Sequence, residues 1–185
     1  MKIHEITGLV KGHGFSVFDS CEYVGGIAAT GCAEYTRKQI DELTEWVKRP
    51  QVGAKGLVYI KCNADGSCKS SIDKFYTPEQ VKAIADAVEA KAGDLVLILC
   101  GAKRKTQTQL GVLRIEMGGR LGLRDPHTFA PLWIVDFPLL EWDDETQRFY
   151  AMHHPFTAPK PEHEKWFYSD RKEDLERVCA NAYDF

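Results

Sequence analysis

Two adjacent histidines, His153 and His154, stand in the stretch AMHHPFTAPK (residues 151–160), just after a run of β-type residues. Imidazoles can ligate a metal, transfer protons or hydrogen-bond a ligand. Adjacent residues of an extended segment point to opposite faces, so the two rings do not easily converge on one ion. Alternation instead directs one histidine inward and one outward, and Phe156 is expected to anchor the stretch to the core. The residues therefore indicate a ligand-binding loop or an ordinary polar turn, and composition alone favours the turn.

Other residue types that could do chemistry form no recognised pattern. The remaining candidate metal ligands have no zinc-like spacing; they are His127, Glu162, His163 and Glu164. The six cysteines include no C-x-x-C pair. They are expected to be free thiols, mostly buried as small apolar groups. No G-x-S-x-G elbow occurs, and the acidic run at 141–145 is typical of a solvated hairpin tip. We therefore predict no metal site and no catalytic residue in this chain.

The bulk composition is that of a soluble globular protein. The chain has 185 residues, 44% hydrophobic and 28% charged, with a net charge of −3. This net charge argues against a protein that binds nucleic acid through its overall electrostatic attraction. A local basic patch at 103–105 remains as a candidate contact with nucleic acid. No apolar run approaches the roughly 20 residues of a membrane span. The N-terminus shows no secretory signal, which predicts a cytoplasmic protein.

Residues 8–123 are predicted to form a two-layer α+β module. Thr36 and Thr77 each precede a glutamine by three residues, which is the capping-box signature of a helix start. The run at 94–100 is apolar on both faces and is expected to be a central strand. Gly25-Gly26 is expected to mark a bulge or tight turn rather than a phosphate cradle. Strands are predicted at 15–18, 24–30, 56–62, 68–75 and 94–100, and helices near 36–49, 77–92 and 103–118.

The sequence pattern of the chain changes at 124–128, where we place a domain boundary. Residues 129–154 are predicted to form a hairpin whose first strand is long and apolar and whose second strand ends at the double histidine. The tail from Ser169 to Tyr183 has helical spacing, with Ser169 or Asp170 as its cap. The module at 8–123 is thus followed by a β-hairpin and a helix.

Seven sequence blocks then occur in the order in which one family shows them. They are TRKQIDELTEWVK, GAKGLVYIK, KAGDLVLIL, LRIEMGGRLGL, APLWIVDFPLLEWD, YAMHHPFTAPK and ANAYD. Together these blocks span most of the chain, and in this order they are far more specific than any one motif. The chain resembles part of a bacterial-type aspartyl-tRNA synthetase, a class II enzyme.

The resemblance implies a fold and a site. Residues 8–123 correspond to the inserted GAD domain, with a mixed β-sheet and flanking helices, and 124–185 to part of the class II catalytic domain. Whole enzymes of this family activate L-aspartate with ATP and Mg²⁺ and transfer it to tRNA(Asp), and the parent enzyme is expected to be a homodimer. By matched position, His153 contacts the aspartate substrate and His154 lies beside it.

The family's other motifs are missing from residues 1–185, including the arginines that clamp ATP and the acidic strand that binds ATP and magnesium. The chain is therefore expected to be a fragment that is inactive alone and binds no cofactor. The alternative is a free-standing GAD-type accessory module that contacts tRNA or a protein partner without catalysis.

Overall fold

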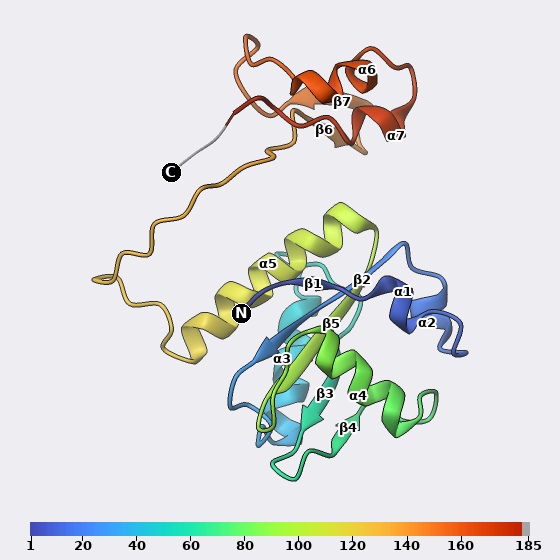
Figure 1. Cartoon of the computed structure of the whole chain (residues 1–185), viewed down its shortest axis with the longest axis vertical. Coiled ribbons are helices and arrows are strands. Elements are labelled where there is room, and N and C mark those ends of the chain that lie inside the picture. The colour runs from blue at the N-terminus through green and yellow to red at the C-terminus, as the bar shows by residue number, and fades with distance from the viewer. Residues whose placement is uncertain (183–185) are drawn as a thin grey trace. The chain divides into compact units, whose positions relative to one another are not determined.

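The computed structural model describes residues 1–182. The chain divides into an N-terminal unit, Met1–Asp125, and a C-terminal unit that begins at Pro126. The N-terminal unit is built on a five-stranded sheet of order β1-β2-β5-β3-β4 (Figure 1). Its strands are β1 (His4–Glu5), β2 (Tyr23–Ala29), β3 (Val58–Cys62), β4 (Cys68–Ser70) and β5 (Leu95–Gly101).

Every pairing in this sheet is antiparallel. The α+β class is confirmed, and so is the central place of β5. The resemblance implied a mixed sheet, and this prediction is wrong because the sheet is antiparallel throughout. Strands β2 and β3 run in the same direction, but β5 lies between them, so each pairs with β5 in the opposite direction. No two neighbouring strands of this sheet are therefore parallel.

The side chains of β5 alternate between two hydrophobic cores, one on each face of the sheet. Val96 and Ile98 join the core formed with α1 (Thr7–Val10), α2 (Ser16–Asp19) and α4 (Pro78–Ala87). Leu95, Leu97 and Leu99 join the core formed with α3 (Arg37–Lys48) and α5 (Lys103–Arg120). The unit thus has three layers, and the two-layer prediction is wrong. A strand that is apolar on both faces requires cover on both faces.

The capping-box sequences correctly predicted the two helices that follow a threonine cap. The hydroxyls of Thr36 and Thr77 accept hydrogen bonds from the backbone N–H groups of Gln39 and Gln80, and both capping boxes are complete. Pro78 occupies the first turn of α4, where its missing N–H has no intrahelical partner to lose.

The strand predicted at 15–18 is instead the short helix α2. Phe15 and Phe18 stand three residues apart, which suits one helical turn as well as a strand, so this short apolar run was ambiguous. Their rings meet edge to face at 4.9 Å, and Phe18 is fully buried. Likewise β4 stops at Ser70 and turns at 71–75 replace the rest of the predicted strand.

Gly25 lies in the regular middle of β2, opposite Leu99, and not in the predicted bulge or turn. A Cβ atom built on Gly25 would approach Leu110 Cδ1 of α5 to 2.7 Å. The close packing of α5 on the sheet therefore explains this glycine.

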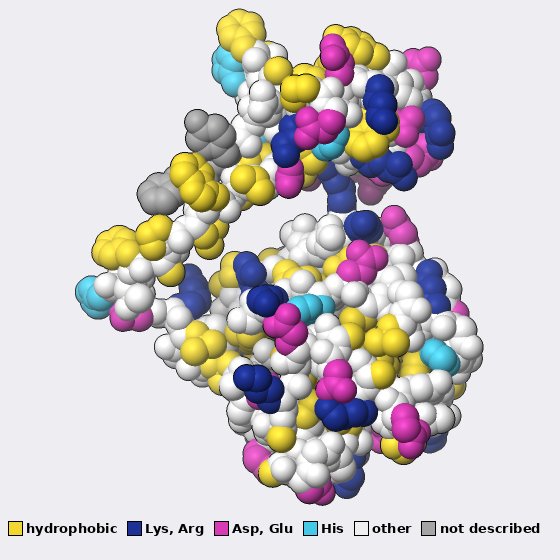
Figure 2. Space-filling model, viewed as in Figure 1, with side chains coloured by type: hydrophobic (Ala, Val, Ile, Leu, Met, Phe, Trp, Pro, Cys, Tyr) yellow, Lys and Arg dark blue, Asp and Glu magenta, His cyan; other side chains and the backbone are white. Residues whose placement is uncertain are grey.

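The C-terminal unit contains a smaller hairpin than predicted, β6 (Leu140–Asp143) with β7 (Arg148–Ala151). Residues 129–137 form no named strand, and several of their apolar side chains are exposed, with Phe129 at 90%. In Figure 2, hydrophobic side chains follow this extended segment. Among residues 126–182, the strands of this unit are β6 and β7.

The tail of the C-terminal unit is less helical than predicted. It contains η1 (Pro161–His163), α6 (Glu164–Phe167) and α7 (Lys172–Leu175). The chain then runs extended, because Cys179 and Ala180 form isolated bridges with Pro138 and Pro159. The N-cap of α7 is Arg171 and not Ser169 or Asp170 as predicted, although Ser169 accepts a hydrogen bond from the N–H of Arg171. The end of the predicted helix, Tyr183, and the last residues of the 124–185 segment lie outside the described residues.

Candidate functional site

The loop that carries the double histidine follows β7 and is held by backbone hydrogen bonds along its length. The N–H of Met152 donates to Leu139 O at 3.0 Å, and the N–H of Thr157 donates to His154 O at 2.8 Å, which closes a tight turn. Beyond the turn, the N–H of Lys160 donates to Cys179 O at 2.9 Å. The loop backbone is therefore fixed on both sides of the histidines.

The two imidazoles point in different directions, as alternation predicted. His153 is half-buried, and its ring packs edge to face against Phe137 with centroids 5.3 Å apart. His154 is exposed, and its Nδ1 accepts a hydrogen bond from the N–H of Phe156 at 3.3 Å. The structure thus separates the two side chains that the sequence places side by side.

The Nε2 atom of His153 is buried and has no hydrogen-bond partner among the described residues. Burying such a group unpaired costs about 1–3 kcal/mol. An imidazole nitrogen can donate or accept one hydrogen bond, depending on its tautomer. Among the described residues, His153 Nε2 is therefore the buried side-chain atom of this loop whose hydrogen-bonding capacity is left unused.

The expected anchor, Phe156, does not reach the core and is 91% exposed. It lies within the tight turn at 154–157, which directs its side chain outward. Polar contacts hold the loop instead. Lys160 forms an ion pair with Asp136, and His163 Nδ1 accepts a hydrogen bond from the N–H of Cys179 at 3.1 Å. Sequence reasoning missed these contacts because their partners lie distant in the chain.

Two carboxylates of the β6–β7 turn accept hydrogen bonds from neighbouring residues. Asp143 Oδ1 accepts hydrogen bonds from the N–H groups of Thr146 and Glu145, and these bonds lower the pKa of its carboxyl. Asp144 accepts a hydrogen bond from the indole of Trp142. Within residues 1–182, no three His, Cys, Asp or Glu side chains gather as metal ligands.

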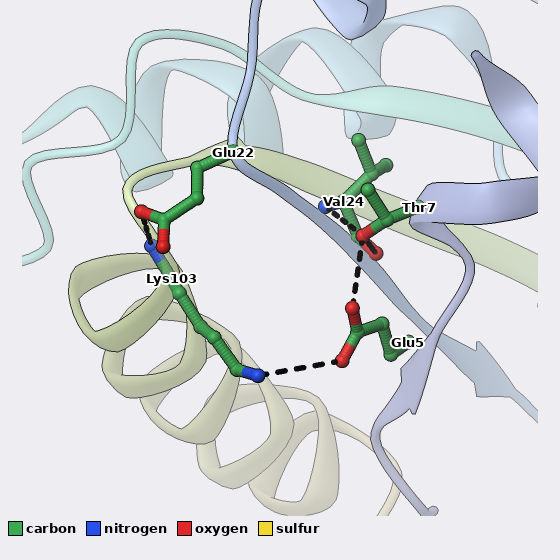
Figure 3. A network of polar contacts seen from close by, with 5 residues as sticks. All are labelled: Glu5, Thr7, Glu22, Val24 and Lys103. Carbon is green, nitrogen blue, oxygen red and sulfur yellow. Dashed lines mark hydrogen bonds and ion pairs between the residues drawn. The ribbon is translucent and has the colours of Figure 1, made fainter. Parts of the chain in front are cut away.

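The basic run at the start of α5 is partly neutralised by acidic side chains (Figure 3). The backbone N–H of Lys103 donates to the Glu22 carboxylate at 3.0 Å. The Lys103 ammonium lies 3.9 Å from Glu5, which in turn accepts a hydrogen bond from Thr7. Glu22 thus fills part of the anion-attracting end of the helix, so the run is a weak candidate for binding nucleic acid.

An open groove runs along α3 and the end of α5. Its lining residues are Arg37, Lys38, Asp41, Glu42, Glu45, Trp46, Arg49 and Arg120. Several of the cations face carboxylates, as in the pairs Arg37–Asp41 at 3.8 Å and Lys38–Glu42 at 4.0 Å. The groove therefore presents mixed charge and does not select a ligand of one sign.

Among helices of residues 1–182, none combines the length and the apolarity that a membrane crossing requires.

Comparison with known proteins identifies the family of the N-terminal unit. The family model of the GAD domain matches residues 16–110, which is more than half of the chain. The chain belongs to the GAD domain family.

Its relatives are larger proteins. An aspartate–tRNA ligase of Porphyromonas gingivalis is 57% identical over 185 residues, which are 100% of this chain and 31% of that protein. The aspartate–tRNA ligase of Parabacteroides distasonis shows the same identity and coverage. That of Flavobacterium psychrophilum is 53% identical over 184 residues, again with 31% of its length covered. The chain thus spans about a third of the length of these relatives.

Proposed function

We propose that the chain is a segment of an aspartate–tRNA ligase, in which residues 8–123 are the inserted GAD domain and 124–185 belong to the class II catalytic domain. The observation that carries this proposal is the 57% identity across all 185 residues. The GAD model matches only up to residue 110, whereas the similarity to the ligase runs over all 185 residues and so includes the C-terminal unit. A free-standing GAD module does not account for that second region.

The proposal extends to the chemistry of the complete enzyme. It activates L-aspartate with ATP and Mg²⁺ and then transfers the aspartyl group to tRNA(Asp), as a cytoplasmic homodimer. Residues of this chain contribute to the recognition of aspartate rather than to the handling of the phosphates. The ATP-binding groups belong to parts of the ligase beyond this segment.

Within that enzyme, His153 is proposed to contact the aspartate substrate. The buried and unpartnered Nε2 supports this role, because a carboxylate of the substrate would supply the missing hydrogen-bond partner. Packing on Phe137 fixes the plane of the ring before the substrate arrives. His154 lies beside this position and is exposed, so its contribution is expected to be smaller.

The test uses the complete ligase that contains this segment, assayed for aspartylation of tRNA(Asp). We expect His153→Ala to raise KM for aspartate about 10-fold to 100-fold, since a hydrogen bond to a charged group contributes about 1.5–3 kcal/mol. The KM for ATP should stay within about twofold of its wild-type value. His154→Ala is the matched control and should change the aspartate KM much less.

Two results would count against the proposal. If the complete protein does not charge tRNA(Asp), the assignment as an aspartate–tRNA ligase fails. If His153→Ala weakens the use of aspartate and ATP equally, the enzyme assignment stands but the role of His153 as an aspartate contact is wrong.

A further inference from the structure

Two cysteines face each other across the β3–β4 hairpin. Cys62, the last residue of β3, stands directly opposite Cys68, the first residue of β4, in the antiparallel register. Their sulfur atoms are 3.9 Å apart, and the Cys68 thiol donates to Cys62 Sγ. Both side chains belong to the core on the α4 side of the sheet.

The backbone places this pair in the position that brings side chains closest. Both backbone groups of Cys62 point away from β4, since its N–H donates to Asp94 O at 2.9 Å and its carbonyl accepts from Gly93 at 2.7 Å. The hairpin bond from the N–H of Asn63 to Ser67 O at 2.8 Å belongs to the adjacent position. Cys62 and Cys68 are therefore a non-hydrogen-bonded pair, for which Cα atoms lie about 4.5 Å apart. That separation is at the short end of the range that a disulfide spans.

The two thiols differ in their access to solvent. Cys62 is buried, with 5% exposed, whereas Cys68 is half-buried at the sheet edge. Burial raises the pKa of the Cys62 thiol to about 12, and the neighbouring Cys68 acts in the same direction. Lys82 faces the pair from α4 and acts in the opposite direction. An incoming reagent therefore meets Cys68 first, while Cys62 stays protonated behind it.

We propose that Cys62 and Cys68 are a redox modification site that closes into an intramolecular disulfide with hydrogen peroxide as the oxidant. The Cys68 thiolate attacks the peroxide O–O bond, forming a sulfenic acid and releasing hydroxide. The Cys62 sulfur then attacks the sulfenic sulfur, and the S–O bond breaks as the S–S bond forms. The two hydroxides take up the Cys62 proton and the proton that Cys68 lost on forming its thiolate, so two thiols and one peroxide give one disulfide and two waters.

The closed form is expected to be reversible. The edge position of Cys68 leaves its side of the bond partly open to a reducing thiol. Attack by an external dithiol restores both thiols through a mixed disulfide. Closure ties the edge strand β4 to β3, so it stiffens one edge of the sheet.

The test relies on a convenient digestion pattern. Trypsin cuts after Lys61 and Lys69, which gives the peptide CNADGSCK with both cysteines and no third one. The reduced chain is treated with a few-fold excess of hydrogen peroxide, alkylated under denaturing acid conditions and digested. We expect this peptide to lack alkyl groups and to be two hydrogens lighter than its reduced form. Dithiothreitol treatment before alkylation should return the doubly alkylated peptide, and amide exchange in β4 should be slower in the oxidised chain.

Variants make the result specific. Cys68→Ser should leave Cys62 alkylated after peroxide, whereas Cys179→Ser, which lies outside the hairpin, should still give the lighter peptide. Melting curves check that each variant is folded. Recovery of the doubly alkylated peptide from the peroxide-treated folded chain would overturn the proposal. So would a Cys68 sulfinic acid with Cys62 still alkylated, or a disulfide that forms only after the chain is denatured.

Discussion

Tyr76 and His153 both carry polar atoms inside the protein, but only one of these atoms is paired. The Tyr76 hydroxyl donates to Val10 O at 2.6 Å in the interior of the N-terminal unit. The Nε2 atom of His153 has no such partner in the described part of the chain. Folding alone therefore explains Tyr76, whereas the proposed aspartate substrate would supply the missing hydrogen bond of His153.

At high pH, Tyr76 should make the stability of the N-terminal unit depend on pH. Burial raises the pKa of its phenol to about 12, whereas an unfolded tyrosine ionises near 10. Between these values the folded state keeps a proton that the unfolded state has lost, so the free energy of unfolding falls as pH rises from about 10 to 12. Below pH 10 the contribution is fully present, and its loss should reach up to about 2 kcal/mol.

Urea denaturation between pH 8 and 12 measures this effect, with Tyr76→Phe as the comparison. The variant has no phenol to ionise, so its stability should decline less steeply above pH 10. The buried Cys62 thiol also titrates near 12, but it is common to both proteins. Equal slopes for the two proteins would contradict the assignment to Tyr76.

Single residues were predictable from sequence where the cause was local. Strand alternation predicted one inward and one outward histidine, and the structure has His153 half-buried and His154 exposed. The exposure of Phe156 was not predictable, because it depends on the turn that Thr157 closes onto His154. The thiol pair was also overlooked, although the strands predicted at 56–62 and 68–75 already placed its two cysteines on successive strands.

Helices and strands, like single residues, were predictable where their causes lie close by in the sequence. The helices that start at Thr36 and Thr77 were evident from their capping boxes. The role of Gly25 was not evident, because Leu110, one of the two residues that exclude a side chain there, lies far along the chain; the other is Tyr23. The apolar segment 129–137 reads as a strand but forms no named strand among the described residues, although Phe137 O accepts a hydrogen bond from the N–H of Ala180 at 2.7 Å.

Two glycine substitutions should have opposite effects on the N-terminal unit. Gly25→Ala forces a Cβ atom against Leu110 and Tyr23 and should destabilise the unit by about 1–3 kcal/mol. Gly111→Ala meets nothing within 4 Å in the interior of α5 and should stabilise it by about 0.5–1 kcal/mol. Urea denaturation at neutral pH compares both with wild type. A neutral Gly25→Ala would show that α5 can shift away from β2.

For the molecule as a whole, the number of layers was the main feature that sequence reasoning got wrong. The order of elements suggested two layers, yet the run LVLIL in β5 is buried on both faces. Alternate residues of that run enter separate cores. A continuous apolar strand is thus better evidence for the number of layers than the order of helices and strands is.

The 185-residue chain alone should show no ATP–pyrophosphate exchange in the presence of aspartate. Adenylate formation requires cations that position the phosphates, and the described residues offer no metal-binding group. The complete ligase, assayed at the same molar concentration, is the positive control. Exchange above the blank for the purified chain would show that it contains a working phosphate site.

The sheet order also determines when the N-terminal unit can fold during synthesis. Strands β2 and β3 never pair with each other and are joined only by β5, which is made last. As the chain leaves the ribosome, the earlier strands present open edges until residues 95–101 emerge and insert between them. This unit therefore passes through a period in which its edges are open to other chains, and the arrival of β5 ends it.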